Sequence, residues 1–140
     1  MTSRSWWLAA VAASVAACSG DDGGTAADAG PPDARIVNGC PALEEPQAAP
    51  GDAIDGDTYV TFAMGFFSQH CIRCHSSTLA GADRNGAPAG YNWDVEATMR
   101  MHLAEIRNAV GVANFMPFSG PQPTCAERQR LVRWIDADAP

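Results

Sequence analysis

The chain has 140 residues, five of them cysteines, and a formal net charge of −7 at pH 7. Residues 19–57 carry nine acidic side chains and one arginine, whereas residues 58–140 carry equal numbers of acidic and basic side chains. No long segment has a surplus of basic residues, so the composition argues against a nucleic-acid partner.

The first residues have the pattern of an export signal. Arg4 precedes an apolar run of Trp, Leu, Ala and Val that is too short to cross a bilayer. The run ends in a sequence that resembles the lipobox of bacterial lipoproteins, Val15-Ala16-Ala17-Cys18. We therefore predict a signal peptide over residues 1–17, lipidation of Cys18, and an exported, periplasmic or outer-membrane-facing lipoprotein held at its membrane by the lipid. An ordinary signal peptide with an incidental cysteine is the alternative.

Residues 18–57 have a different composition, in which Gly, Ala, Pro and Asp dominate and apolar periodicity is missing. Such a segment buries too little surface to fold, and its acidic side chains repel one another. We predict a flexible, disordered acidic tether over residues 18–57, rather than an acidic docking patch. The same reasoning expects residues 41–57 to remain unattached unless a covalent bond holds them.

A first helix is predicted from Thr58 to about His70, capped by Asp55 or Asp57. Ala63 and Phe67 lie one turn apart on one face of this helix.

Directly after it stands the pentapeptide Cys71-Ile72-Arg73-Cys74-His75, whose C-x-x-C-H pattern is typical of covalent c-type haem attachment. Each thiol can add across one haem vinyl group, and the following imidazole can bind the iron. A dithiol redox motif needs a βαβ context, and a zinc site usually needs four N or S ligands; the sequence shows neither. We therefore predict one covalent haem c attached at Cys71 and Cys74, with His75 as an iron ligand.

Residues 76–93 are predicted to form a loop, because Gly and Pro recur along them. In this loop the carbonyl of Pro88 is a candidate acceptor for the Nδ1–H of His75, although a plain loop proline is an equal alternative. A second helix is predicted from Val95 to about Val110, begun by Asn92 or Asp94 and ended by Gly111.

Two side chains on the apolar face of that second helix, Met99 and His102, could in principle bind iron. We expect them to be core residues. Met116 is a better candidate for the sixth coordination position, because Pro117 restricts it to extended backbone in an irregular stretch after the haem motif. A thioether there would raise the reduction potential. The alternative is a methionine that fills a gap in the packing.

The last helix is predicted from Thr124 to about Ala137, with a capping box formed by Thr124 and Glu127. Helical spacing predicts that its apolar face is formed by Leu131, Trp134 and Ile135. The same spacing predicts three arginines that face water: Arg128, Arg130 and Arg133.

Residues 58–140 resemble class I cytochrome c of the small bacterial mono-haem kind. The likeness rests on the C-x-x-C-H pentapeptide, on Met116-Pro117, and on a last helix that ends Leu131-x-x-Trp134-Ile135. It implies an all-α fold of three main helices around a covalently bound haem, with His75 and Met116 as axial ligands. It also implies that Ala63 and Phe67 of the first helix pack on Leu131 and Trp134 of the last. Departures from the family are the short stretch between histidine and methionine and two further cysteines.

The resemblance implies a monomeric one-electron carrier that serves redox partner proteins. No paired general acid and base, nucleophile elbow or Gly-rich phosphate loop occurs in the sequence, so we predict a carrier rather than an enzyme. Two alternatives stay open: a haem peroxidase or gas sensor with an open sixth position, and a structural lipoprotein without haem.

The remaining cysteines can be assigned by subtraction. Lipidation uses Cys18 and haem attachment uses Cys71 and Cys74, which leaves Cys40 and Cys125 in an oxidising compartment. We predict that these two form a disulfide, with their Cα atoms within about 7 Å. Free or intermolecular thiols are the alternative.

Overall fold

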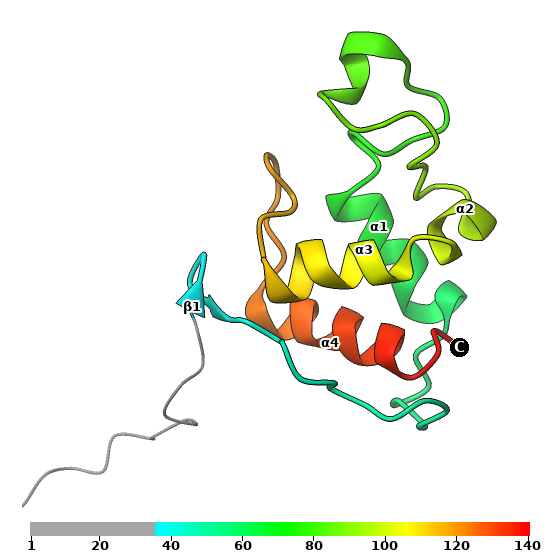
Figure 1. Cartoon of the computed structure of the whole chain (residues 1–140). Helices are drawn as coiled ribbons and strands as arrows, with labels where there is room; N and C mark the ends of the chain where they lie inside the picture. The colour runs from blue at the N-terminus through cyan, green and yellow to red at the C-terminus, as the bar shows by residue number, and fades with distance from the viewer. Residues whose placement is uncertain (1–35) are drawn as a thin grey trace, which may run out of the picture. The chain divides into compact units, whose positions relative to one another are not determined.

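The computed structural model describes residues 36–140, so the predicted signal peptide, Cys18 and residues 19–35 lie outside the described residues. Residues 36–140 form a small, mostly helical domain (Figure 1). Two short strands, β1 (Ile36–Val37) and β2 (Cys40–Pro41), pair as an antiparallel hairpin. The helical elements are η1 (Tyr59–Ala63), α1 (Met64–His70), η2 (Gly81–Arg84), α2 (Glu96–Arg100), α3 (Leu103–Arg107), η3 (Asn108–Val112) and α4 (Cys125–Asp136). No helix of residues 36–140 is long and apolar enough to cross a membrane.

The first predicted helix is present as η1 followed directly by α1. A capping box begins it: the Thr58 hydroxyl accepts from the Thr61 N–H at 3.1 Å, and the Thr58 N–H donates to the Thr61 hydroxyl at 2.8 Å. The prediction that Asp55 or Asp57 caps this helix is wrong. Asp57 instead accepts two hydrogen bonds from Arg130 of α4, so its carboxylate is not available to the helix N-terminus.

The second predicted helix is interrupted. It forms as α2, a break at residues 101–102, then α3 and η3. His102 leaves helical geometry at the break, with φ −121° and ψ 22°, and its ring stacks on that of Tyr91 at 4.2 Å between centroids. The predicted cap by Asn92 or Asp94 is absent, because Val95 is the N-cap and the Asp94 carboxylate accepts hydrogen bonds from Ser76 and Ser77 instead.

Gly111, predicted to end the second helix, lies inside η3 and lets η3 approach α4. A Cβ atom at this position would lie 2.5 Å from Cγ2 of Val132. The close approach explains why glycine occupies a helical position that would otherwise favour alanine.

The last helix, α4, matches its prediction closely, with the capping box of Thr124 and Glu127 in place. One part of that prediction is wrong. Arg128 does not face water but is only 4% exposed, because its guanidinium donates to the carbonyls of Val110 and Met116.

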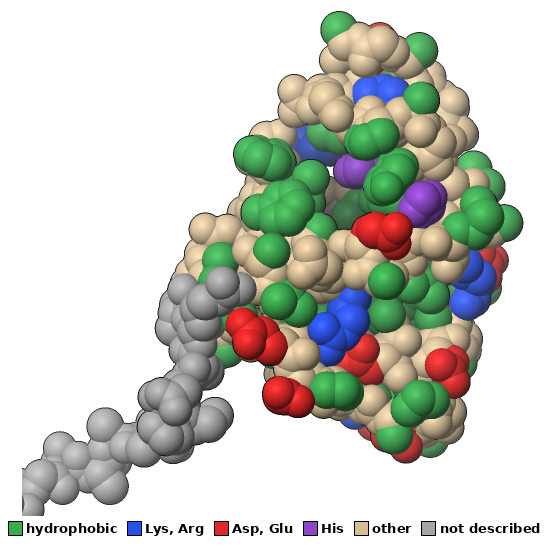
Figure 2. Space-filling view, in the orientation of Figure 1, with side chains coloured by type: hydrophobic (Ala, Val, Ile, Leu, Met, Phe, Trp, Pro, Cys, Tyr) green, Lys and Arg blue, Asp and Glu red, His purple; other side chains and the backbone are tan. Residues whose placement is uncertain are grey.

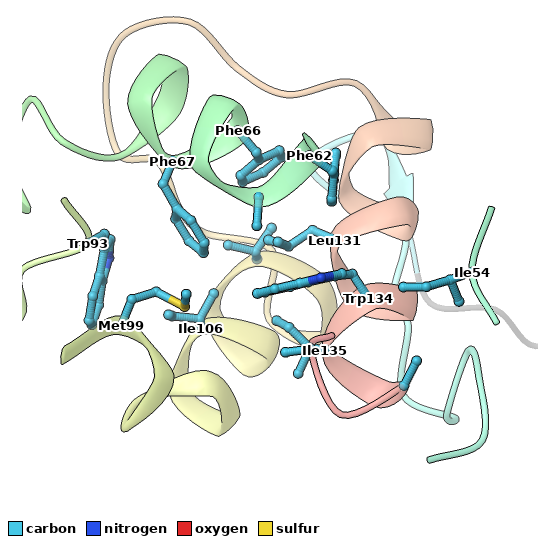
Figure 3. Packing of buried hydrophobic residues seen from close by; sticks show 14 residues of the cluster. Ile54, Phe62, Phe66, Phe67, Trp93, Met99, Ile106, Leu131, Trp134 and Ile135 are labelled. Atoms are coloured by element: carbon cyan, nitrogen blue, oxygen red, sulfur yellow. The ribbon is translucent and has the colours of Figure 1, made fainter. Parts of the chain in front are cut away.

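The core lies between α1, the α2–α3 segment and α4, and Figure 3 shows its larger side chains pointing into one cluster. The four residues that the resemblance places at a helix contact are all fully buried there: Ala63, Phe67, Leu131 and Trp134. Besides this shared cluster, α4 packs chiefly against α3 and η3, as Figure 1 shows for α3.

Residues 41–57 belong to the folded domain. The Cys40–Cys125 bond meets the condition set for this segment, but the expectation that its own side chains bury too little surface to hold it is wrong. Ile54 is 5% exposed and joins the core cluster. The Leu43 N–H donates to the Gly111 carbonyl at 3.1 Å, and the Gln47 N–H donates to the Asp136 carboxylate at 2.8 Å. Ile54, a few long-range hydrogen bonds and the bond from neighbouring Cys40 to Cys125 therefore fix a segment whose composition is typical of a tether.

The predicted disulfide is present. Cys40 of the hairpin and Cys125 at the start of α4 are bonded, with 5.4 Å between their Cα atoms. The disulfide indicates an oxidising location outside the cytoplasm.

Candidate cofactor-binding site

A cavity of about 520 Å³ opens between the end of α1, the loop of residues 85–93, α3 with η3, and the loop of residues 115–119. Its lining is mostly apolar, and Figure 2 shows hydrophobic side chains around a hollow on this face of the molecule. Cavities that bind cofactors typically have volumes of about 300–1,000 Å³ and a few polar groups in apolar surroundings.

The pentapeptide reaches this cavity because it continues the turn of α1. The N–H groups of Cys71 and His75 donate to the carbonyls of Phe67 and Cys71 at 2.9 and 3.0 Å. This geometry places Cys71, Cys74 and His75 together on the cavity wall, as the spacing predicts. Unlike Cys40 and Cys125, the two cysteines here are not bonded to each other.

The environment of Cys71 does not suit a dithiol oxidoreductase. Burial, with a smaller contribution from neighbouring Cys74, raises the pKa of the Cys71 thiol to about 12. A nucleophilic cysteine needs a lowered pKa, so that its thiolate is populated at neutral pH.

His75 is held in one orientation by its surroundings. Its Nδ1 lies 3.1 Å from the carbonyl oxygen of Tyr91, and its ring stacks on Trp93 with 5.0 Å between centroids and 14° between planes. Donation from Nδ1–H leaves the lone pair on Nε2, the tautomer that binds a metal. Burial lowers the pKa of His75, and the hydrogen bond to Tyr91 opposes this only in part, so the ring is neutral at pH 7.

The acceptor for His75 is therefore not the carbonyl of Pro88 that the sequence suggested. The Pro88 carbonyl accepts instead from Nη2 of Arg84 at 2.9 Å. The same nitrogen donates to the Tyr91 carbonyl at 3.0 Å, and this arranges the loop so that Tyr91, three residues later, faces the imidazole.

Met116 lies on the opposite loop and lines the same cavity. Its N–H donates to the Ala109 carbonyl at 3.2 Å, and its carbonyl accepts from Nη1 of Arg128 at 2.7 Å. The other ligand candidates are placed elsewhere: Met99 is fully buried in the core, and neither Met99 nor His102 lines the cavity.

Three further side chains hold the Met116 loop, and sequence reasoning missed all of them. Nδ1 of His70 lies 2.9 Å from the carbonyl oxygen of Pro121. The guanidinium of Arg73 packs over Gly120, where any side chain would collide with it. Arg128, the third, was predicted to face water. Helical periodicity did not reveal it, because its partners come from other segments of the chain.

The described residues fit a covalent haem on two independent grounds. The donor set combines two thiols with an imidazole nitrogen and a thioether, which is suited to a c-type haem and its iron. The enclosing surface is apolar, as a porphyrin requires. Within residues 36–140, no cluster of three or more His, Cys, Asp or Glu side chains is arranged to hold a metal ion by itself.

Comparisons of the chain with protein-family models, with characterised proteins and with solved structures gave no match.

Proposed function

We propose that this protein is a one-electron carrier of the class I cytochrome c type, exported and anchored to a membrane through a lipid on Cys18. One observation carries the proposal. Cys71, Cys74, His75 and Met116 come from two segments some forty residues apart in the chain and line a single apolar cavity. A C-x-x-C-H pentapeptide alone predicts attachment; a methionine on the same cavity supplies the further group that a closed, six-coordinate iron needs.

The roles of the residues follow from their surroundings. Cys71 and Cys74 would hold the ring through thioether bonds, and His75 would bind the iron through Nε2, since Nδ1 is engaged with Tyr91. Met116 would bind the opposite side through its sulfur. A c-type haem supplies reversible one-electron chemistry at iron, and the protein sets its potential and excludes water and small ligands.

The test is the absorption spectrum of the full chain produced in a host that matures c-type cytochromes. We expect a Soret band that persists after denaturation, since the haem is covalent, and the weak charge-transfer band of methionine bound to ferric iron. Met116→Ala should keep the covalent haem, lose this band and gain carbon monoxide binding. Met99→Ala is the matched control and should keep the band.

Other results would overturn the proposal in distinct ways. A high-spin spectrum of the unmodified chain that shifts with carbon monoxide or cyanide would indicate a sensor or peroxidase. A chain without a Soret band, produced beside a control cytochrome that matures normally, would indicate a protein without haem.

A further inference from the structure

Arg84 is buried in the loop beside His75 and has an unusual set of partners. It is 5% exposed, and every hydrogen bond that its guanidinium makes among the described residues ends on a neutral oxygen. The shorter of these bonds, from 2.7 to 3.1 Å, go to four backbone carbonyls and one side-chain amide: Ser76, Ala87, Pro88, Tyr91 and Asn92.

No carboxylate of residues 36–140 forms an ion pair with this guanidinium. Asp94 lies on the adjoining segment, but its carboxylate accepts hydrogen bonds from Ser76 and Ser77. A guanidinium carries a permanent positive charge, and burying a charge without a counter-charge is costly even when hydrogen bonds surround it. The loop therefore buries a fixed positive charge at a position where a neutral hydrogen-bond donor would cost less free energy of folding.

The charge lies next to His75. The Tyr91 carbonyl oxygen is 3.0 Å from Nη2 of Arg84 and 3.1 Å from Nδ1 of His75, so guanidinium and imidazole share one acceptor. A carbonyl that already accepts from a cation attracts the Nδ1 proton less strongly. The imidazole then becomes a weaker electron donor through Nε2 than one whose Nδ1–H meets an unshared carbonyl.

We propose that Arg84 is a positioning residue that also raises the reduction potential of an iron bound by His75. This inference rests on the proposed function. When one electron leaves the iron for a partner protein, the site gains one positive charge, and a fixed positive charge nearby makes that gain less favourable. Weaker electron donation from His75 acts in the same direction, because it stabilises the ferric state less.

The proposal is tested on the haem-loaded full chain by spectroelectrochemical titration. In Arg84→Gln we expect the equilibrium constant for reduction to fall about tenfold, which is about 59 mV for one electron. Arg84→Lys keeps the charge and should retain most of the potential. Arg133→Gln removes a charge from a side chain that is 42% exposed, and as the matched control it should change the equilibrium constant less than about twofold.

A second variant, Asn92→Asp, tests the inference in case Arg84→Gln does not fold. Oδ1 of Asn92 accepts from Nη1 of Arg84 at 3.0 Å, so Asn92→Asp preserves the shape and the hydrogen bond while it supplies the missing counter-charge. We expect the potential to fall and the melting temperature to stay level or rise. The ¹H–¹⁵N resonance of His75 Nδ1–H should shift, since the shared carbonyl changes. Gln129→Glu, an exposed neutral-to-acidic change on α4, is the control.

An unchanged potential in Asn92→Asp would mean that a charge at this place does not act on the iron, and that result overturns the inference. So does a folded Arg84→Gln with an unchanged potential, or a fall in Arg84→Lys as large as in Arg84→Gln. In these cases the haem spectrum is normal and the proposed function stands. A chain that never acquires haem overturns the proposed function, and this inference with it.

Discussion

The two sides of the cavity are built in different ways. On the His75 side, Arg84 organises one loop, and all of its hydrogen-bond partners lie within eight residues of it in the sequence. On the Met116 side, distant segments hold the loop. His70 reaches Pro121, and Asn114 exchanges hydrogen bonds with Val37 and Asn38 of the β hairpin, 77 and 76 residues away.

Because of this difference, the two sides of the cavity depend on different parts of the chain. On the His75 side, the hydrogen bonds that orient the loop are local in sequence. The Met116 side needs the hairpin, and Cys40 of that hairpin is bonded to Cys125 at the start of α4. We therefore expect damage to the N-terminal part of the domain to release Met116 before it affects His75.

The largest effect should come from removing the proposed haem, whose cavity both sides line. In Cys71→Ala with Cys74→Ala, a cavity of about 520 Å³ would lack its filling group. The apolar walls of this cavity would then face water, which removes hydrophobic stabilisation from a domain of small total stability. We expect loss of helical circular dichroism and rapid proteolysis. Met116→Ala, which keeps the attachment, should remain folded, and a cooperative melt of the double variant would contradict the expectation.

The next largest effect should come from the disulfide. Cys40 and Cys125 are separated by 85 residues, so the chain-entropy model gives their bond at most about 4–5 kcal/mol. In Cys40→Ser with Cys125→Ser we expect lower stability to urea and, well before unfolding, loss of the methionine charge-transfer band. Covalent haem and the His75 ligand should remain. If both ligand signals disappear at the same urea concentration, the two sides are not independent.

Arg128→Met tests the Met116 side without touching the hairpin. It leaves the Val110 and Met116 carbonyls without their buried donor, which we expect to cost about 2–3 kcal/mol. The variant should bind carbon monoxide more readily than the unmodified protein, because the Met116 loop is released. Gln129→Met, at the exposed neighbouring position, is the matched control; equal carbon monoxide binding by both variants would show that Arg128 does not hold the loop.

The smallest effect should come from Asp57, which lies on neither side. Hydrogen bonds from Arg130 lower the pKa of Asp57, while burial opposes them. The ion pair therefore stabilises the fold at pH values above the unfolded-state aspartate pKa of about 3.9. Its contribution is about 1 kcal/mol, because the arginine of the pair is half exposed. This contribution is lost as the pH falls through the lowered pKa of Asp57 in the folded protein. Asp57→Asn should remove that part of the acid dependence in thermal melts and leave the reduction potential unchanged. A shifted potential would mean that this pair is coupled to the cavity.

Residues that are close in sequence could be predicted, because their relations are fixed by covalent spacing. The pentapeptide, the Thr124–Glu127 capping box and the bounds of α4 belong to this class. The cap of the first helix was predicted at Asp55 or Asp57 but lies at Thr58, because Arg130 of a distant segment engages the Asp57 carboxylate. The prediction that Arg128 faces water was also wrong, because the carbonyls that its guanidinium binds belong to other segments of the chain.

The sequence by itself therefore determined which groups are available to a site: two thiols and an imidazole at fixed spacing, a methionine before a proline, and two further cysteines. The tertiary structure alone decided which carbonyl orients His75, that residues 41–57 join the core, and that Met116 shares a cavity with the pentapeptide. The physical reason is that local spacing sets which groups a segment can offer. Hydrogen bonds and apolar contacts between distant segments set which of those groups meet, and a sequence read one segment at a time does not contain that information.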